Sequence, residues 1–253
     1  MEVHHHPKVE KKNFKEYFLE FLMIFLAVTL GFFAESFREH LLENKKEKDF
    51  IVSFKEDLVT DTAGLNQAMF LGTLQYGKLD TLYILLRSVI EQKPVNMNRL
   101  YYLKFRYASG LVSFKPDKRT ISQIQSTGSF SLITNRKCRD SITVYENFND
   151  DVIQENAGTY KDWLVDLNKM SQKIFDYDQA KTFGFVGGAE AYLNDSLKLN
   201  LITNDKTLLN EYANKVRSLM MILNILILTE NTQLVRCNGL IDLLNKEYHL
   251  GNE

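Results

Sequence analysis

The chain has 253 residues, 45% of them hydrophobic, and a formal net charge of −1. This length and apolar content suffice for a membrane anchor and one sizeable folded core. The near-neutral charge lacks the basic excess typical of a nucleic-acid partner, so we expect no nucleic acid to bind. Two cysteines are too few for a disulfide framework, and three prolines in the whole chain favour long helices.

Residues 1–16 form a polar tail that contains three adjacent histidines, His4, His5 and His6. Neighbouring side chains cannot all reach one metal ion without further ligands. We therefore interpret the triplet as part of a solvated tail, and we expect neither a metal nor a cofactor.

Residues 17–37 contain the most apolar stretch of the chain, and residues 21–34 carry neither charge nor proline. As a helix, residues 17–37 would measure about 30 Å, the thickness of a hydrocarbon core. Glu20 and Glu35 lie near its two ends, where a carboxylate can reach the headgroups. They also lie near one face, so a polar contact between spanning helices is the alternative role. The segment predicts a transmembrane helix.

Two other interpretations of this segment are weaker. A cleaved signal peptide would need a small side chain three residues before the cut, and Phe32 occupies that position for a cut after Ala34. A core helix of a soluble protein would need partners on every side, because the segment is apolar all round. An uncleaved signal anchor fits better.

Four lysines in the tail set the expected orientation: Lys8, Lys11, Lys12 and Lys15. They are the basic residues closest to the membrane, which favours a cytoplasmic N-terminus. We expect a cytoplasmic tail at residues 1–16 and an extracytoplasmic helical bundle at residues 38–253, held in a bacterial inner membrane.

After the membrane, a first long helix is predicted by apolar residues at alternating spacings of three and four. The row ends before Pro94 and comprises Ile51, Phe54, Leu58, Asp61, Leu65, Ala68, Gly72, Gln75, Leu79, Leu82, Leu86 and Val89. Residues 98–114 fit a helix or a strand, and we favour a helix. Thr120 and Gln123 resemble a capping box that opens a short helix, and Gly128 closes it.

Two further long helices complete the expected bundle. The first starts after Asn135, a good N-cap residue, and its apolar row has one skipped step between Val152 and Tyr160. The row comprises Cys138, Ile142, Tyr145, Asn149, Val152, Asn156, Tyr160, Trp163, Leu167, Met170, Ile174 and Tyr177. Residues 183–204 form an irregular connection. The last helix runs from about Leu209 to Tyr248, and residues 219–228 within it are apolar on nearly all sides, which predicts the most enclosed part of the bundle. The fold class expected is all-α: an N-terminal transmembrane helix that continues into an elongated antiparallel bundle.

Four polar or reactive residues lie on these apolar rows. Asp61 and Glu230 could be paired carboxylates at a ligand site, but a bend toward solvent or a contact that fixes helix register is more common. Cys138 and Cys237 fit small packing residues. In an antiparallel register they would lie roughly 16 Å apart, beyond the approximately 7 Å limit between Cα atoms for a disulfide.

No catalytic constellation is recognisable. The glycines of residues 184–188 lack the preceding strand and following helix of a phosphate loop, and His40 and His249 stand in no triad-like setting. We therefore expect no enzymatic activity.

Three stretches carry a resemblance to a known family: residues 1–36, 47–62 and 120–147. Together they resemble uncharacterised single-span membrane proteins from Bacteroidota that are grouped only as a domain of unknown function. The matching central positions are Ile124, Ser126, Gly128, Leu132, Ile133, Asn135, Arg139, Ile142 and Tyr145. Cys138 stands where the family usually has Leu. The resemblance implies no activity. Gly128 and Asn135 are expected to shape a structural turn.

The functional expectation is a membrane-anchored protein that acts through protein–protein contacts, as a scaffold or a subunit of an envelope complex. Its partners would be the lipid bilayer and either an unknown protein or further copies of itself. The alternative is an extracytoplasmic ligand sensor that works through a partner.

Overall fold

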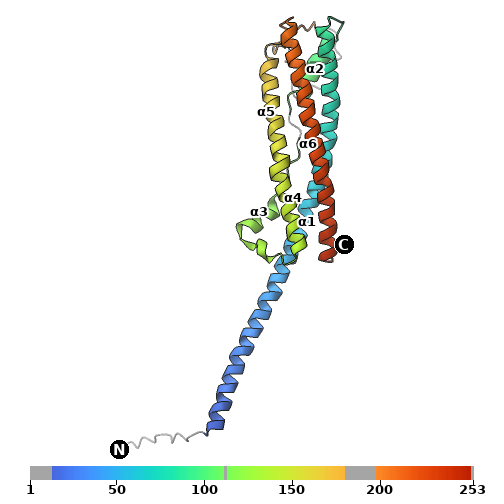
Figure 1. The fold of residues 1–253 in the computed structure, drawn as a ribbon. Helices are drawn as coiled ribbons and strands as arrows, with labels where there is room; N and C mark the ends of the chain where they lie inside the picture. Colours follow the sequence, from blue (N-terminus) through green and yellow to red (C-terminus); the bar gives the residue numbers. More distant parts are fainter. Residues whose placement is uncertain (1–12, 111–112, 180–197, 252–253) are drawn as a thin grey trace, which may run out of the picture. The chain divides into compact units, whose positions relative to one another are not determined.

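The computed structural model describes residues 13–110, 113–179 and 198–251, and their regular elements are all helical (Figure 1). The helices are α1 (Phe14–Ile90), α2 (Met97–Tyr107), α3 (Arg119–Ser126), α4 (Arg136–Phe148), α5 (Gln154–Ser171) and α6 (Lys206–Glu247). A 3-10 turn, Ser129–Leu132, precedes α4, and a π-turn, Asn149–Ile153, joins α4 to α5. The all-α prediction is confirmed. The histidine triplet and the glycines of residues 184–188 lie outside the described residues.

The chain divides after Phe50 into two compact parts, and α1 contributes residues to both. In the first part, the exposed large apolar side chains between Phe14 and Phe37 range from 47% exposure at Leu26 to 84% at Phe14. Two helices, α1 and α6, contain stretches long and apolar enough to cross a membrane. None of the stretch in α1 is buried, whereas 33% of the stretch in α6 is.

The second part, from Ile51 onward, has a core built on the predicted apolar row of α1. Every member of that row from Ile51 to Leu86 is buried, and Val89 is half-buried. α6 runs antiparallel to α1, because Asp80 pairs with Arg217 while Arg87, nearer the end of α1, bonds Asn210. α4 is also antiparallel to α6, since the Asn135 amide, before α4, donates to Glu247 Oε2, whereas Tyr145 O, later in α4, accepts from Gln233 Nε2, earlier in α6. The expected antiparallel packing is therefore present within this part.

The apolar row predicted for the third long helix is correct at most positions and one residue off at three positions within or after the π-turn. The residues predicted to face the core there were Val152, Asn156 and Trp163, but those buried are Ile153, Ala157 and Leu164. A π-turn holds one more residue than an α-turn, which accounts for a shift of one residue at these positions. Four other predicted positions that follow are buried as predicted: Tyr160, Leu167, Met170 and Ile174. The skipped step in the sequence marked the place but not the size of the shift.

The sequence predicted that residues 219–228 of α6 are the most enclosed part of the bundle, and this prediction is wrong. Leu219, Leu223 and Leu226 are buried, but Met221 is 64% exposed and Leu228 is 58% exposed. The apolar pattern continues around the helix, whereas the core covers one side only. That leaves an apolar outer side on α6.

The turn between α3 and α4 is built on the expected two residues, with one correction. Gly128 follows α3 with φ of 66°, a left-handed conformation that glycine adopts without strain, and the Asn135 side chain accepts from Cys138 N. The capping box at Thr120 was wrong. Lys118 occupies the N-cap of α3 without a side-chain cap bond, and Thr120 lies inside the helix.

Candidate functional site

The most connected polar site is a short loop held across two long helices. We term residues 114–120 the strap. Three buried carboxylates accept its backbone N–H groups: Glu230 Oε1 from Phe114 at 2.8 Å, Asp61 Oδ1 from Asp117 at 2.7 Å, and Asp57 Oδ2 from Thr120 at 2.9 Å. Asp57 and Asp61 come from successive turns of α1, and Glu230 comes from α6. The strap therefore ties both helices together through its own backbone.

The fit of the strap depends on a glycine. A Cβ built on Gly64 would lie 3.2 Å from Cε2 of Phe114, so the bare backbone of α1 lets the buried Phe114 ring approach. The second carboxylate oxygen of Asp61 accepts from the Tyr145 hydroxyl of α4 at 2.7 Å. One aspartate thus joins α1, the strap and α4.

Burial shifts the titration of these acids. The pKa of Asp61 is raised to about 6 by burial, although its bonds to Asp117 N and the Tyr145 hydroxyl oppose the shift. Burial raises the pKa of Glu230 to about 7 against the bond from Phe114 N. Burial also raises the pKa of Glu146, on α4, to about 7, and nearby Lys118 opposes it. The second part of the chain therefore holds three carboxyl groups that gain protons near neutral pH.

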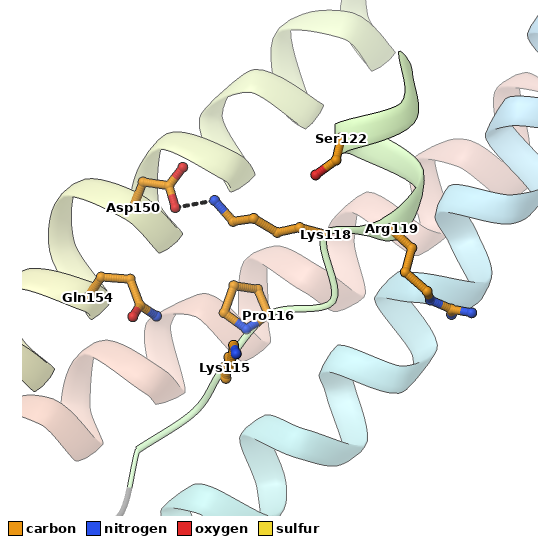
Figure 2. A pocket seen from close by; sticks show the side chains of 7 residues that line it. All are labelled: Lys115, Pro116, Lys118, Arg119, Ser122, Asp150 and Gln154. Atoms are coloured by element: carbon orange, nitrogen blue, oxygen red, sulfur yellow. Dashed lines mark hydrogen bonds and ion pairs between the residues drawn. The ribbon is translucent and has the colours of Figure 1, made fainter. Parts of the chain in front are cut away.

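A pocket of about 520 Å³ opens beside the strap (Figure 2). Its lining is rich in basic and polar side chains: Lys115, Pro116, Lys118, Arg119, Ser122, Asp150 and Gln154. Figure 2 shows Lys118 directed across the pocket to Asp150, whereas Arg119 points away toward α1, where it pairs with Asp57. Because both of these cations already pair with carboxylates, and Arg119 N and Thr120 N already donate to aspartates, the pocket is a poor anion site.

Lys104 on α2 is a second buried charge, 1% exposed. Its Nζ donates to the Tyr177 hydroxyl at 2.8 Å and lies 3.8 Å from the centre of the Phe105 ring. Burial lowers the pKa of Lys104 to about 7. The Tyr177 hydroxyl also bonds Ser171, so this cluster fastens α2 to the end of α5.

The remaining predicted positions do not join these clusters. Glu35 belongs to the first part and pairs with Arg38, one turn away. Glu20 lies in the first part as well. Cys138 and Cys237 are both buried thiols, as expected of packing residues, and the Cys237 thiol donates to the Leu58 carbonyl at 3.2 Å. Among the described residues, no group of three or more His, Cys, Asp or Glu side chains could hold a metal ion.

An exposed apolar surface lies on α1 and α6. We term it the α1/α6 face, and it comprises Val59, Phe70, Leu74, Met221, Ile225, Leu228 and Val235, which are 42–70% exposed. The two helices touch beneath it: a Cβ built on Gly72 would lie 3.0 Å from Ile227 Cγ1. Scattered exposed apolar residues are normal, but aligned rows on two neighbouring helices are typical of an interaction surface.

Comparison of the chain with protein-family models, with curated proteins and with solved structures found no match. The resemblance to the Bacteroidota group therefore stays a prediction.

Sequence reasoning found Asp61 and Glu230 but not what joins them. The strap is an irregular segment that ends in the first residues of α3, and it has no periodicity, so nothing in the pattern showed that its N–H groups would meet these acids. Asp57 and Lys104 were missed because a charged residue beside an apolar row is usually solvated. The α1/α6 face could have been found from the absence of charged residues outside the core row.

Proposed function

We propose that this chain is a membrane-anchored, non-enzymatic helical protein that acts through protein–protein contacts, as a scaffold or a subunit of an envelope complex. The observation that carries the proposal is the α1/α6 face. Its side chains are apolar, exposed and aligned on two packed helices. The folded chain gains nothing from keeping them in water, and a protein partner would bury them.

The anchor is the apolar stretch of α1 at residues 17–37, which is long enough to cross a membrane and is not buried. An N-terminal signal sequence has the same properties, and Phe32 at the position that signal cleavage requires to be small favours retention. With the tail lysines inside, the second part would lie outside the cytoplasm of a bacterial inner membrane.

The ligand-sensor alternative depended on Asp61 or Glu230 lining an open site. Both oxygens of Asp61 and Oε1 of Glu230 accept bonds from the chain itself. These acids therefore support a structural role better than ligand binding.

The test is a pull-down of the intact chain from gently solubilised membranes, comparing wild type with Leu228→Glu and Val165→Glu. Both positions are exposed, Leu228 on the α1/α6 face and Val165 on α5. We expect Leu228→Glu to lose the bound protein, either a different protein or a second copy, and Val165→Glu to retain it. If all three variants recover the same partners, or none recovers any, contact through this face is excluded.

A further inference from the structure

We infer that the occupant of the α1/α6 face is a second copy of this chain, placed by a two-fold axis that runs along the two helices. This inference rests on the proposed function and names its partner. Three features of the face carry it: the absence of charge, the matching of large and small residues across the axis, and the polar groups within it.

The first feature is the composition of the two helical stretches that bear the face. Residues 59–77 of α1 and residues 218–235 of α6 contain no lysine, arginine or histidine. Their two acidic residues, Asp61 and Glu230, are only 3% and 1% exposed. Since 25% of the whole chain is charged, a surface of this length would ordinarily carry several charges. Each stretch is about 28 Å long, and the cores of protein interfaces are depleted of charge in this way.

The second feature is the register between the helices. Thr62 Oγ1 lies 3.3 Å from Cys237 Sγ, and Asp80 pairs with Arg217 at 3.3 Å. Interpolation between these contacts puts Phe70 level with Leu228 and Gly77 level with Met221.

A two-fold axis parallel to the helices would set α1 of one copy against α6 of the other at unchanged levels. Large side chains then meet small ones near both ends of the face: Met221 meets Gly77, and Val235 meets Ala63. Phe70 meets Leu228 between them. The Cβ position of Gly77 has no neighbour within 4 Å in the single chain, which leaves room for Met221 of a second copy. At these three pairs the face is complementary to itself, as a two-fold interface requires.

The third feature distinguishes a protein from lipid. The rows are interrupted by uncharged polar side chains that are exposed, among them Asn66, Thr73, Asn224 and Asn231. Amides and hydroxyls can bond across a protein interface, but in hydrocarbon they would lose water without replacement. Helices that lie on a membrane surface are also usually rich in lysine and arginine, which are missing from both stretches.

The test uses the full chain in its membrane. One population carries Phe70→Cys and the other carries Leu228→Cys, and the two are co-expressed and oxidised mildly. We expect a disulfide-linked species of twice the chain mass only when both variants are present. The control mixes Val144→Cys and Val165→Cys, exposed positions on α4 and α5. The native cysteines are buried in both experiments.

Light scattering in mild detergent gives an independent measure. Wild type and Val165→Glu should have the mass of two chains, and Leu228→Glu the mass of one, with unchanged helical circular dichroism. A wild type with the mass of one chain, together with no cross-link between Phe70→Cys and Leu228→Cys, overturns the second copy as occupant. In that case, the proposed function still holds if the pull-down recovers a different protein with wild type and loses it with Leu228→Glu. If no such protein is lost, both the proposed function and the second copy are excluded.

Discussion

Glu230 shows how a buried acid can serve structure in this chain. It is 1% exposed, and the backbone N–H of Phe114 donates to it at 2.8 Å. An ionised acceptor strengthens that bond, but burial penalises the charge and raises the pKa of Glu230 to about 7. The same conflict applies to Asp61. The strap is therefore held by groups whose charge depends on pH.

The first prediction follows from the sign of these shifts. A carboxyl whose pKa is raised by folding stabilises the folded chain fully below its unfolded pKa, here 3.8 for Asp61 and 4.5 for Glu230. That stabilisation is lost as the pH rises through 6 and 7. We expect Glu230→Gln, which keeps an acceptor oxygen, to reduce this loss between pH 4.5 and 7.5. The measurement is urea unfolding of the full chain in mild detergent, followed by circular dichroism.

Two further variants complete that experiment. Glu230→Ala leaves the buried Phe114 N–H unpaired. Its free energy of unfolding should therefore be about 1–3 kcal/mol lower than that of Glu230→Gln. Glu155→Gln, an exposed change on α5, should follow the wild-type pH dependence. If Glu230→Gln has the same pH slope as wild type, Glu230 is ionised throughout and the account of the strap is wrong.

Lys104 gives the second prediction, with the opposite sign. Folding lowers the pKa of Lys104 from 10.5 to about 7, so its contribution to stability is lost as the pH falls from about 10.5 through 7. Replacing it by methionine removes the buried charge and retains most of the apolar stem. Lys104→Met should therefore raise the unfolding free energy more at pH 6 than at pH 9, whereas the exposed Lys161→Met should have the same small effect at both. An equal effect of Lys104→Met at both pH values would contradict a neutral buried amine.

At the scale of the helices, α1 and α6 are in close contact at a glycine. A Cβ on Gly72 would meet Ile227 at 3.0 Å, whereas a Cβ on Gly158 of α5 would meet nothing within 4 Å. We expect Gly72→Leu to lower the unfolding free energy by about 1–3 kcal/mol through overpacking. Gly158→Leu should raise it by up to about 1 kcal/mol, because leucine favours helix over glycine. Thermal unfolding of the two variants distinguishes these effects, and equal changes would exclude a close contact at Gly72.

The helices themselves could be predicted because their apolar rows repeat at helical spacing. The row of α1 from Ile51 to Leu86 is buried at every predicted position. The π-turn could not be predicted in detail, since one extra residue leaves both neighbouring rows intact and changes only their phase. The N-cap of α3 was wrong for a related reason. Thr120 has the right side chain for a local cap, but the Asp57 carboxylate, 63 residues away in sequence, accepts its N–H instead.

In the candidate site too, the residues with a local signal in the sequence could be predicted and the tertiary contacts could not. Asp61 and Glu230 stood out because each breaks an apolar row, which is a local signal. Their shared hydrogen-bond partner, the strap, meets them only in the tertiary structure, so it could not be predicted from local sequence. In α6, the sequence showed that residues 219–228 are apolar all round but not that one side would stay exposed. Apolar content alone does not distinguish a surrounded helix from one that awaits a partner.

At the scale of the whole molecule, the two parts of the chain differ in what their apolar surfaces require. The stretch at residues 17–37 is exposed on every side, which suits lipid. In the second part, the α1/α6 face lies on one side of two helices and contains polar uncharged groups, which suits a protein. The same chain thus presents one surface of each kind.

The anchor and its orientation yield the fourth prediction. The intact chain should stay in the membrane pellet after an alkaline carbonate wash, and a version without its first 40 residues should not. Val144→Cys, an exposed position on α4, should react with a membrane-impermeant maleimide in cells with a permeabilised outer membrane and an intact inner membrane. Labelling only after lysis of the inner membrane would show the opposite orientation. Loss of the intact chain from the membrane pellet would contradict the presence of a membrane anchor.

The most direct measurement of the central claim is photocross-linking from residue 228 of the full chain in its native membrane. A benzophenone side chain replaces Leu228, and a matched variant carries it at Val165. The account predicts a protein adduct from position 228 and none from position 165. An adduct with lipid, or no adduct beyond that of the control, would contradict a protein-binding face on α1 and α6.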